Sequence, residues 1–413
     1  MHEQEFVSYD KGLGIGDNYH EWNLLREDVS LPAACLSSEN VEHNLRWMQE
    51  FIKKYNVKLA PHGKTTMCPK LFHQQLSYGS WAITLATVQQ VQIAYSAGIR
   101  RILMANQLVG KTNMAIIKKK LLDDDPDFDF YCLIDSSTNV EQLGEFFNSN
   151  KQTKLQVLLE IGVRNGRTGI RTEEDETIIL NTLTQYKDSL ALVGVELFEG
   201  VLHEEEPIRV MLQRTVASLQ RLINSNQLAR SPPILSGAGS AWYDIVAEEF
   251  SKMGTTADII LRSGCYITHD RGVYQLAQKR MLQQNAIVQE ISKDNTLRPA
   301  LQIWAYVQSI PETNRVIIGL GKRDAAFDAG FPLPILHYRS EWSKPIEIDH
   351  NNYKIILMMD QHAIMTCPSD HNLIVGDILV FDISHPCLTF DKWKKILLIN
   401  NNYSVIDVLD TYF

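Results

Sequence analysis

Lys64 stands where a reactive lysine would be useful. It lies in VKLAPHGKTTMCP, residues 57–69, at the point where an apolar run ends and a small turn begins. A lysine amine can form a Schiff base with an aldehyde when its surroundings lower the pKa of the ammonium group. An exposed loop lysine is the plainer interpretation, and this stretch alone does not decide between the two.

A histidine and a cysteine occur two positions apart in FDISHPCLTFDKW, residues 381–393. On an extended strand, residues i and i+2 point to the same side, which predicts that His385 and Cys387 face one side together. Imidazole and thiolate are good zinc ligands, but a catalytic zinc usually takes more than two ligands from the protein, so water or substrate would complete the site. A coincidental pair is the alternative. His362, in DQHAIMT, is a candidate extra ligand or a core histidine.

Small residues follow two predicted strands, in SGAGSAW at 236–242 and in RSGCY at 262–266. Backbone N–H groups in such turns can approach an anion, and the helical pattern after the first turn adds a helix N-terminus. Barrels often bind phosphate after strands seven and eight, which favours a phosphate site over a purely steric explanation. The candidate residues are Ser236, Gly237, Gly239, Ser240, Gly264 and Tyr266.

Two arginines follow another predicted strand, in EIGVRNGRTG at 160–169. Arg164 and Arg167 could neutralise a phenolate or a carboxylate. An ordinary arginine turn closed by glycines explains this motif equally well.

The elements that must position these residues repeat along the chain. Each short apolar run is followed by a polar or glycine turn and then by a helical pattern. Eight such units predict an α/β fold, a (β/α)8 TIM barrel over residues 31–275, with reactive groups at the C-terminal ends of its strands. An open doubly wound sheet uses the same local patterns and is the alternative. The runs lie at 57–61, 81–86, 101–106, 130–135, 155–162, 192–198, 232–237 and 258–264.

The pattern of apolar and turn residues changes after residue 275. Short β-type runs, separated by turn residues, predict an all-β domain over 276–413. We expect residues 1–30 to contribute to this domain and the predicted metal site to lie in it. The runs are at 286–292, 300–310, 315–321, 353–359, 376–384 and 394–401.

Composition narrows the class of protein. The 413 residues include 40 Lys and Arg against 49 Asp and Glu, so the net charge is 40 − 49 = −9, which argues against a nucleic-acid partner. Apolar runs are too short for a membrane span, and the N-terminal stretch is polar. Six scattered cysteines do not form a disulfide framework. We expect a cytoplasmic protein that has no membrane partner and acts on a small molecule.

The chain resembles the fold-type III pyridoxal-phosphate enzymes of the D-serine dehydratase and D-threonine aldolase family, which are relatives of alanine racemase. The resemblance covers nearly the whole chain. The order of its motifs is more specific than any one of them. They are PHGKT (61–65), EIGVRNGRTG (160–169), SGAGS (236–240), RSGCY (262–266), DQHA (360–363) and SHPC (384–387).

This resemblance implies an N-terminal barrel that carries pyridoxal 5'-phosphate, a C-terminal β domain and a homodimer. Lys64 would hold the cofactor covalently, with His62 beside it. Arg167 would contact the phenolic oxygen of the cofactor, and the two glycine turns would hold its phosphate. His385 and Cys387 would bind a divalent metal, zinc or manganese.

The metal pair indicates the branch of the family. His-x-Cys is similar to the dehydratases, whereas aldolases typically carry His-x-Asp. The chain is most similar to the bacterial amino acid deaminase branch, which includes D-threo-3-hydroxyaspartate dehydratase, although PHGKTTMCP and ELFEGVL (196–202) depart from better-known branches. We therefore expect a lyase, a metal-dependent dehydratase that converts a D-3-hydroxy amino acid, such as D-serine or D-threo-3-hydroxyaspartate, to a 2-oxo acid and ammonia.

Two other functions use the same cofactor. Retro-aldol cleavage of the D-threonine aldolase type would give glycine and an aldehyde, and a non-catalytic carrier would only bind the cofactor. A carrier has no use for the metal pair. Lys322 and Arg323, in GLGKRDAAFDAG at 319–330, could receive a second substrate carboxylate or form a charged turn. D-serine is the substrate we expect.

Overall fold

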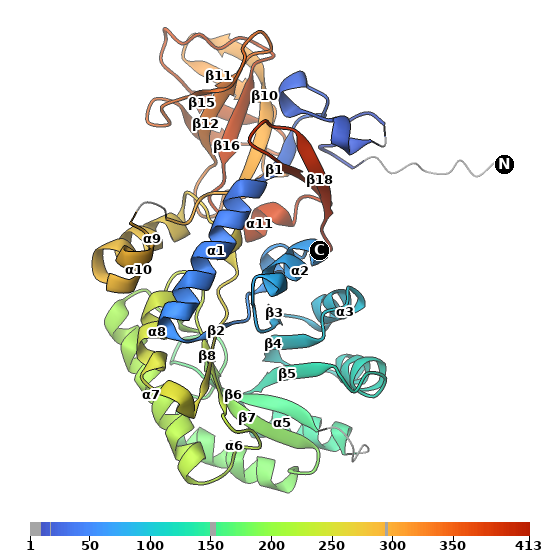
Figure 1. The fold of residues 1–413 in the computed structure, drawn as a ribbon, viewed down its shortest axis with the longest axis vertical. Coiled ribbons are helices and arrows are strands. Elements are labelled where there is room, and N and C mark those ends of the chain that lie inside the picture. The colour runs from blue at the N-terminus through green and yellow to red at the C-terminus, as the bar shows by residue number, and fades with distance from the viewer. Residues whose placement is uncertain (1–9, 17, 149–153, 294–295) are drawn as a thin grey trace, which may run out of the picture.

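The computed structural model describes residues 10–16, 18–148, 154–293 and 296–413. These residues form two sheets, a barrel of parallel strands and a second, mostly antiparallel sheet above it in Figure 1. The long helix α1, Ser38–Tyr55, runs from the second sheet along the side of the barrel (Figure 1). In the described part of the chain, no helix is long and apolar enough to cross a membrane.

Within the described residues, eight parallel strands form the barrel in the order β2-β9-β8-β7-β6-β5-β4-β3. Two backbone hydrogen bonds close it between its end strands: the Trp81 amide donates to the Leu59 carbonyl at 2.7 Å, and the Thr84 amide donates to the Pro61 carbonyl at 2.9 Å. This closure excludes an open doubly wound sheet, so the predicted (β/α)8 barrel is confirmed. The strands are β2 (Lys58–Leu59), β3 (Ile83–Leu85), β4 (Arg101–Gln107), β5 (Asp129–Ile134), β6 (Leu155–Ile161), β7 (Leu190–Leu197), β8 (Ile234–Gly237) and β9 (Asp258–Leu261).

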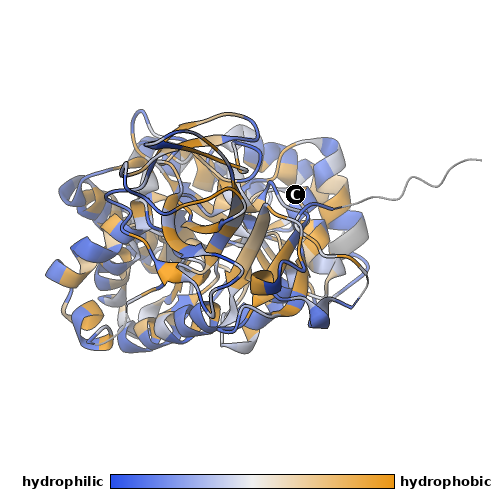
Figure 2. Ribbon diagram, turned by 90° about the horizontal axis from the view of Figure 1, so that it is seen from above, coloured by the Kyte–Doolittle hydropathy of each residue, from blue (hydrophilic) through white to orange (hydrophobic). Residues whose placement is uncertain are grey.

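The barrel strands are buried on both faces, which is why each strand has a nearly continuous apolar sequence. Leu103, Leu133 and Leu158 belong to the hydrophobic cluster inside the barrel. The outer side of the strands packs under helices that carry both hydrophilic and hydrophobic segments, visible at the periphery of Figure 2. The inside of the barrel is therefore a packed core, and only its rim is open to ligands.

The helices around the barrel begin at polar caps. Ser37 accepts a hydrogen bond from the Asn40 amide, and Thr172 forms a capping box with Asp175. After α1, these helices are α2 (Pro69–Ser77), α3 (Val88–Ser96), α4 (Lys111–Ala115) continued by a π-helical turn (Ile116–Leu122), α5 (Ser137–Phe147), α6 (Glu173–Gln185), α7 (Glu205–Asn224) and α8 (Tyr243–Ser251).

The second sheet contains ten strands among the described residues, and one of them comes from the N-terminal part of the chain. Strand β1 pairs antiparallel with β10 and parallel with β17. The segment 33–37 thus lies in the second sheet, while the exact domain boundaries stay predictions. The strands are β1 (Ala33–Ser37), β10 (Leu301–Glu312), β11 (Arg315–Ile318), β12 (Leu333–Tyr338), β13 (Ile346–Glu347), β14 (Lys354–Met358), β15 (Ala363–Thr366), β16 (Ile378–Asp382), β17 (Lys395–Ile399) and β18 (Val405–Asp410).

The apolar run at 286–292 is not a strand, so that part of the prediction was wrong. It forms α10, Ala286–Ile291, directly after α9, Val273–Gln284. Asn285 caps α10 by accepting a hydrogen bond from the Val288 amide at 3.0 Å. Val288 and Ile291 are three residues apart and both pack into the main core, as a helical face does.

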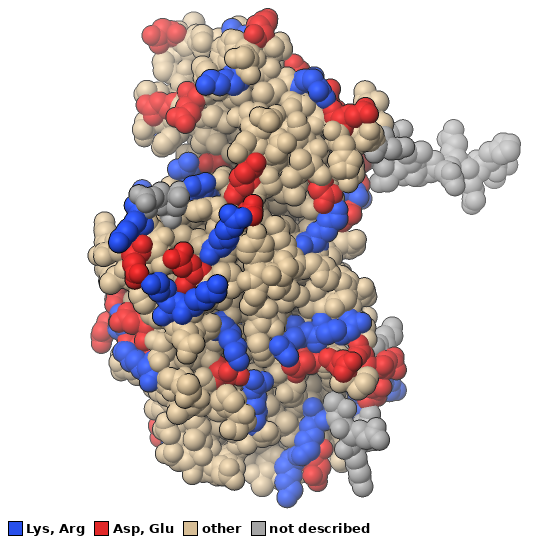
Figure 3. Space-filling model, in the orientation of Figure 1, with Lys and Arg blue, Asp and Glu red and all other residues tan. Residues whose placement is uncertain are grey.

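The second domain covers the C-terminal ends of the barrel strands. The short helix α11, Cys387–Phe390, follows β16 and packs against the turn after β2. The end of the chain returns to the same place, because the Tyr412 amide donates to the Met67 carbonyl at 3.0 Å. Acidic and basic side chains are interspersed on the face that Figure 3 shows. This face therefore has no large patch of a single charge.

The position of β1 leads to a stability prediction. Leu36 is fully buried in the main hydrophobic core, and truncating it to alanine removes apolar contacts from β1 and leaves a cavity. We expect Leu36→Ala to lower the free energy of unfolding by about 2–5 kcal/mol, measured by denaturant titration. Ile15→Ala is the control, since Ile15 is 98% exposed and its loss should change little. Equal effects of the two substitutions would contradict the structural role of β1.

Candidate active site

A cavity of about 530 Å³ lies where the second domain meets the rim of the barrel. Its volume is that of a small-molecule site. Motifs that are far apart in the sequence meet here, and they come from both domains. The residues that line it include His62 and Lys64 after β2, Gly239 and Ser240 after β8, Gly264 and Cys265 after β9, and His385 and Cys387 of the second domain.

Lys64 lies in a single 3-10 turn, Gly63–Thr65, directly after β2. The turn is tight because Gly63 packs on Phe72, whose ring atom would lie 2.7 Å from a Cβ at position 63. Lys64 itself is exposed to the cavity, and its amine has no hydrogen bond or ion pair with another described residue. The structure therefore presents a free lysine amine at the C-terminal end of a barrel strand.

His62 lines the same cavity and is held neutral. Burial lowers the pKa of its imidazole well below the ordinary range, and the charges of Lys64, Arg262 and Arg167 lower this pKa further. Its Nδ1 atom is buried without a hydrogen-bond partner. A buried ring nitrogen without a partner, beside a free amine, fits a polar ligand in this cavity.

The turn after β8 already binds an anionic group of the protein. The amides of Ala238 and Gly239 donate to the two carboxylate oxygens of Glu199 at 3.2 and 2.6 Å. Glu199 is fully buried, and this burial raises the pKa of its carboxyl group. The backbone of SGAGS is thus arranged to receive negatively charged oxygen, as a phosphate site requires.

The predicted phosphate residues do not all reach the cavity. Gly239 and Ser240 line it, and Ser240 Oγ accepts a hydrogen bond from the Cys265 amide at 3.1 Å. Ser236 lies below the rim, where its hydroxyl donates to the Ile260 carbonyl at 3.0 Å. Gly237 is buried beside Phe250. Ser236 and Gly237 therefore support the turn from below, and their direct role in cofactor binding stays a prediction.

Of the two predicted phosphate-binding residues in the turn after β9, only one lines the cavity. Gly264 lines the cavity, and a Cβ at this position would lie 2.4 Å from the His62 carbonyl oxygen, so only glycine fits there. Tyr266 is buried in a separate small hollow, and its hydroxyl accepts a hydrogen bond from Gln75 Nε2 at 3.3 Å. Tyr266 thus packs beneath the rim and does not line the main cavity.

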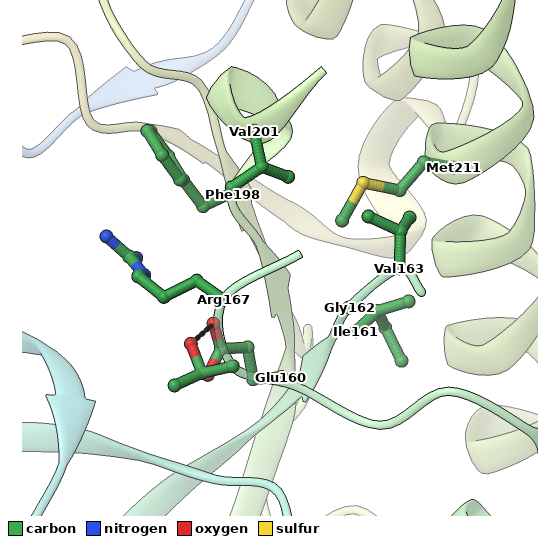
Figure 4. Close-up of a pocket in the computed structure, with 9 residues that line it drawn as sticks. Glu160, Ile161, Gly162, Val163, Arg167, Phe198, Val201 and Met211 are labelled. Carbon is green, nitrogen blue, oxygen red and sulfur yellow. Dashed lines mark hydrogen bonds between the residues drawn. The ribbon is translucent and has the colours of Figure 1, made fainter. Parts of the chain in front are cut away.

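Arg167 lies beside the cavity rather than in its lining. Its guanidinium carbon is 4.8 Å from the centre of the Phe198 ring, and Phe198 does line the cavity. Figure 4 shows Arg167 below Phe198 in a small hollow, where the Thr168 hydroxyl donates to Glu160 at 2.5 Å. Arg164 is exposed in the turn before it. The contact of Arg167 with the cofactor therefore stays a prediction.

Arg262 is a cavity residue that the sequence did not single out, although it opens the RSGCY motif. It lies at the floor of the cavity and donates to Glu196 at 2.6 Å and to the Leu197 carbonyl at 2.7 Å. Burial raises the pKa of Glu196 to about 8, while the neighbouring Arg262 opposes the shift. This ion pair holds the Arg262 guanidinium in a fixed position in the cavity lining.

The predicted geometry of the His385–Cys387 pair was wrong, and its role as a metal site stays a prediction. His385 lies in a loop and Cys387 begins α11, with Pro386 in helical conformation (φ −60°, ψ −49°), so no extended strand joins them. Both side chains nevertheless line the cavity. His385 Nδ1 lies 2.7 Å from Asp328 Oδ2, which leaves Nε2 as the nitrogen available to a metal. His362 is exposed and is not a lining residue.

Cys387 has an unpredicted neighbour, Cys265. Their sulfur atoms are 3.6 Å apart, and Thr65 Oγ1 lies 3.5 Å from the Cys387 sulfur. Hydrogen bonds from Cys265 and Thr65, together with the charge of Lys64, lower the pKa of Cys387 to about 7. The donor set fits a divalent metal of the softer kind, although among the described side chains no three His, Cys, Asp or Glu already stand together as a metal cluster.

Two family models match the chain. The model of the alanine racemase N-terminal domain matches residues 36–253, and the model of a serine dehydratase domain matches residues 300–399. The first match alone covers more than half of the chain. The chain therefore belongs to the fold-type III pyridoxal-phosphate family that has an alanine racemase-type N-terminal domain, as its motifs predicted.

Curated relatives match more than half of the chain. D-threonine aldolase of Arthrobacter sp. is 25% identical over 312 residues, which are 74% of this chain and 75% of that protein. D-threo-3-hydroxyaspartate dehydratase of Delftia sp. (strain HT23) is 22% identical over 245 residues, 59% of this chain and 62% of that protein. Both relatives are lyases, and the prediction of a lyase of this family is confirmed.

Solved structures show the same fold at low sequence identity. D-threonine aldolase from Filomicrobium marinum has a TM-score of 0.77 at 19% identity, with 98% of both chains covered. The Delftia sp. HT23 dehydratase has a TM-score of 0.72 at 18% identity, with 94% of this chain and 99% of that chain covered. These likenesses support the barrel and the β domain as one unit.

The Glu199 contact leads to a binding prediction. Glu199→Gln replaces the carboxylate by a neutral amide, which is a weaker acceptor for the Ala238 and Gly239 amides and does not repel a phosphate. We expect the cofactor-free variant to bind pyridoxal phosphate about tenfold more tightly than the unchanged protein, measured by fluorescence titration. Glu174→Gln, on the exposed start of α6, is the matched control. Unchanged or weaker binding by Glu199→Gln would show that phosphate does not use this turn.

Proposed function

We propose that this protein is a pyridoxal-phosphate- and divalent-metal-dependent dehydratase that converts a D-3-hydroxy amino acid to a 2-oxo acid and ammonia. The observation that carries the proposal is that Lys64, the anion-binding turn and the His385–Cys387 pair line one cavity. A lyase that expels hydroxide needs all three: a covalent hold on the cofactor, a phosphate anchor and a Lewis acid at the leaving group.

The cofactor residues follow from the lining of the cavity. Pyridoxal phosphate supplies an electron sink for the carbanion at the substrate's α carbon. Lys64 would hold its aldehyde carbon, while the backbone amides near Gly239 and the Ser240 hydroxyl would hold its phosphate. With the substrate amine bound in place of Lys64, the Lys64 amine would be the group in the cavity positioned to take the α proton.

The metal residues act at the other end of the substrate. Hydroxide is a poor leaving group, and a divalent metal held by His385 and Cys387 would stabilise its developing charge as a Lewis acid. Asp328 keeps the His385 ring in the orientation that presents Nε2. Loss of water leaves an enamine, which takes up water in solution and gives the 2-oxo acid and ammonia.

Retro-aldol cleavage is the second candidate. The D-threonine aldolases of Arthrobacter and Filomicrobium marinum match this chain over 74% and 98% of its length, and this favours an aldolase as much as the dehydratase relative favours dehydration. The cysteine in SHPC is the residue that makes dehydration our first choice. The products separate the two, since an aldolase releases glycine and an aldehyde. The serine dehydratase domain match at 300–399 speaks against a non-catalytic carrier.

The cavity indicates a small substrate. Among the described Lys and Arg side chains, Lys64 and Arg262 line it, whereas Lys322 and Arg323 do not. Arg323 instead lies near Asp360, and the ammonium of Lys322 is 5.1 Å from the Phe327 ring. Lys322 and Arg323 therefore do not supply a second carboxylate site in this cavity, and D-serine stays the expected substrate. The homodimer and the cytoplasmic location implied by the resemblance also stay predictions.

The activity test is direct. We expect purified protein to form 2-oxo acid from D-serine or D-threo-3-hydroxyaspartate, to lose this activity with a chelator, and to regain it with zinc or manganese. A dehydrogenase-coupled assay measures the oxo acid, and glycine is measured in the same samples. Glycine without oxo acid would replace the dehydratase by the aldolase.

Substitutions assign the roles. Lys64→Ala should abolish turnover and covalent attachment of the cofactor, because no other described lysine lines the cavity. Cys387→Ala should lose metal and dehydration while it still binds the cofactor. Lys54→Ala, at a surface ion pair with Glu290, is the control and should stay active. Dehydration that persists in Cys387→Ala would remove the metal from the mechanism.

A further inference from the structure

Two cysteine thiols lie in contact in the cavity, and the proposed reaction uses only one of them. The sulfur atoms of Cys265 and Cys387 are 3.6 Å apart, and both residues line the cavity. Cys387 is assigned to the metal under the proposed function, whereas the thiol of Cys265 has no part in it. An accessible cysteine beside a second, resolving cysteine is the arrangement found in redox-sensing proteins.

The two sulfur atoms are close enough to bond after a small movement. A disulfide bond is about 2.05 Å long, so the atoms must approach each other by about 1.5 Å. Thr65 Oγ1 lies 3.6 Å from the Cys265 sulfur and 3.5 Å from the Cys387 sulfur. These three distances form a nearly equilateral triangle. The hydroxyl therefore lies to one side and leaves the path between the sulfur atoms open.

Only one partner of the pair has to move. Cys265 is held by its backbone, because its amide donates to Ser240 Oγ at 3.1 Å and the preceding Gly264 packs on the His62 carbonyl. Cys387 is the first residue of the short helix α11, and it faces the open cavity. Rotation of the Cys387 side chain about its Cα–Cβ bond supplies a movement of the required size without displacing the barrel.

The two cysteines differ in exposure, and this difference sets the order in which they react. Cys265 is only 4% exposed, whereas Cys387 is partly exposed. An oxidant that enters the cavity therefore meets Cys387 first, and Cys265 is the buried partner behind it. The other cysteines are buried and do not line the cavity; they are Cys35, Cys68, Cys132 and Cys367.

We propose that Cys265 and Cys387 form a reversible disulfide when hydrogen peroxide enters the cavity. The Cys387 sulfur attacks one peroxide oxygen, the O–O bond breaks and hydroxide leaves, which gives a sulfenic acid. The Cys265 sulfur then attacks the Cys387 sulfur and displaces the sulfenic oxygen as hydroxide. The two hydroxides take up the two thiol protons. Two thiols and one peroxide thus become one disulfide and two waters, with the sulfur atoms oxidised and the peroxide reduced.

The disulfide would act as a switch on the proposed reaction. It consumes the thiolate that the metal needs, and it joins the turn after β9 to the helix after β16, 122 residues further along the chain. The cross-link stands on the geometry of the two sulfur atoms, whereas the loss of activity rests on the metal role of Cys387 in the proposed function. An external thiol such as dithiothreitol would restore both cysteines.

Peptide masses test the cross-link. We would treat the cofactor-bound protein with hydrogen peroxide, with a chelator or with one equivalent of zinc, alkylate the free thiols and digest the protein without reduction. With chelator, we expect peptides joined through Cys265 and Cys387 to replace most of the free peptides and to separate again with dithiothreitol. The joined pair is lighter than the two free peptides by two hydrogen atoms. Zinc should slow its formation, because a thiolate bound to metal is a weaker nucleophile toward peroxide.

Substitutions show which thiol resolves the other. Cys265→Ser should give no joined pair and should leave Cys387 as a sulfenic acid that dimedone labels. Cys367→Ser, at a buried cysteine outside the cavity, is the matched control and should form the joined pair as fully as the unchanged protein. The masses from the unchanged protein decide the matter even if Cys265→Ser does not fold.

The outcomes separate this inference from the proposed function. Oxidised Cys387 beside a free Cys265 thiol in the unchanged protein would overturn the switch, and so would two free thiols after treatment with excess peroxide. Dehydration that persists in fully cross-linked protein would leave the disulfide standing and remove Cys387 from the proposed function. Dehydration that is absent before any oxidation would overturn the proposed function alone, since the peptide masses still report the cross-link.

Discussion

The closure of the barrel at its shortest strand is the constraint on which the whole site depends. Strand β2 has only two paired residues, and its continuation is held from both sides: the Ala60 amide donates to Leu261 at 2.8 Å, and the Thr84 amide donates to Pro61 at 2.9 Å. The turn that carries Lys64 is therefore wedged between β9 and β3. Because Gly264 touches the His62 carbonyl, the backbone after β9 runs directly beside this turn. Lys64 and Cys265 become neighbours through backbone packing, without any direct bond between them.

The second domain completes the site only because its ends are tied to the barrel. Strand β1 lies between β10 and β17, so the residues that lead into α1 and the barrel are part of the upper sheet. At the other end, Tyr412 bonds to Met67, just after the Lys64 turn. These two connections hold the loop after β16 over the cavity, and His385 and Cys387 reach it from there. The chemistry thus depends on long-range packing between elements that begin and end the described chain.

The sequence predicted what local periodicity determines and missed what long-range contacts determine. The eight barrel strands were predictable because strands buried on both faces require apolar runs. The run at 286–292 has the same composition, yet the Asn285 cap and its packing make it a helix. Strand β12 contains Pro334 and His337 and gave little signal. Cys265 was visible in RSGCY, but its partner is 122 residues away, and no spacing rule connects them.

The electrostatics of the cavity explain why its acidic and basic groups can coexist in so small a space. His62 stays neutral because it is buried beside Lys64, Arg262 and Arg167. The Glu199 carboxylate accepts hydrogen bonds from two backbone amides, and the Glu196 carboxylate accepts one from Arg262. Neither carboxylate forms an ion pair with Lys64. With both carboxylates engaged elsewhere, the Lys64 amine has no ion-pair partner among the described residues, and its charge helps to lower the pKa of the Cys387 thiol. The Lys64 amine is thus free because Glu196 and Glu199 bind other groups, as well as because of where β2 ends.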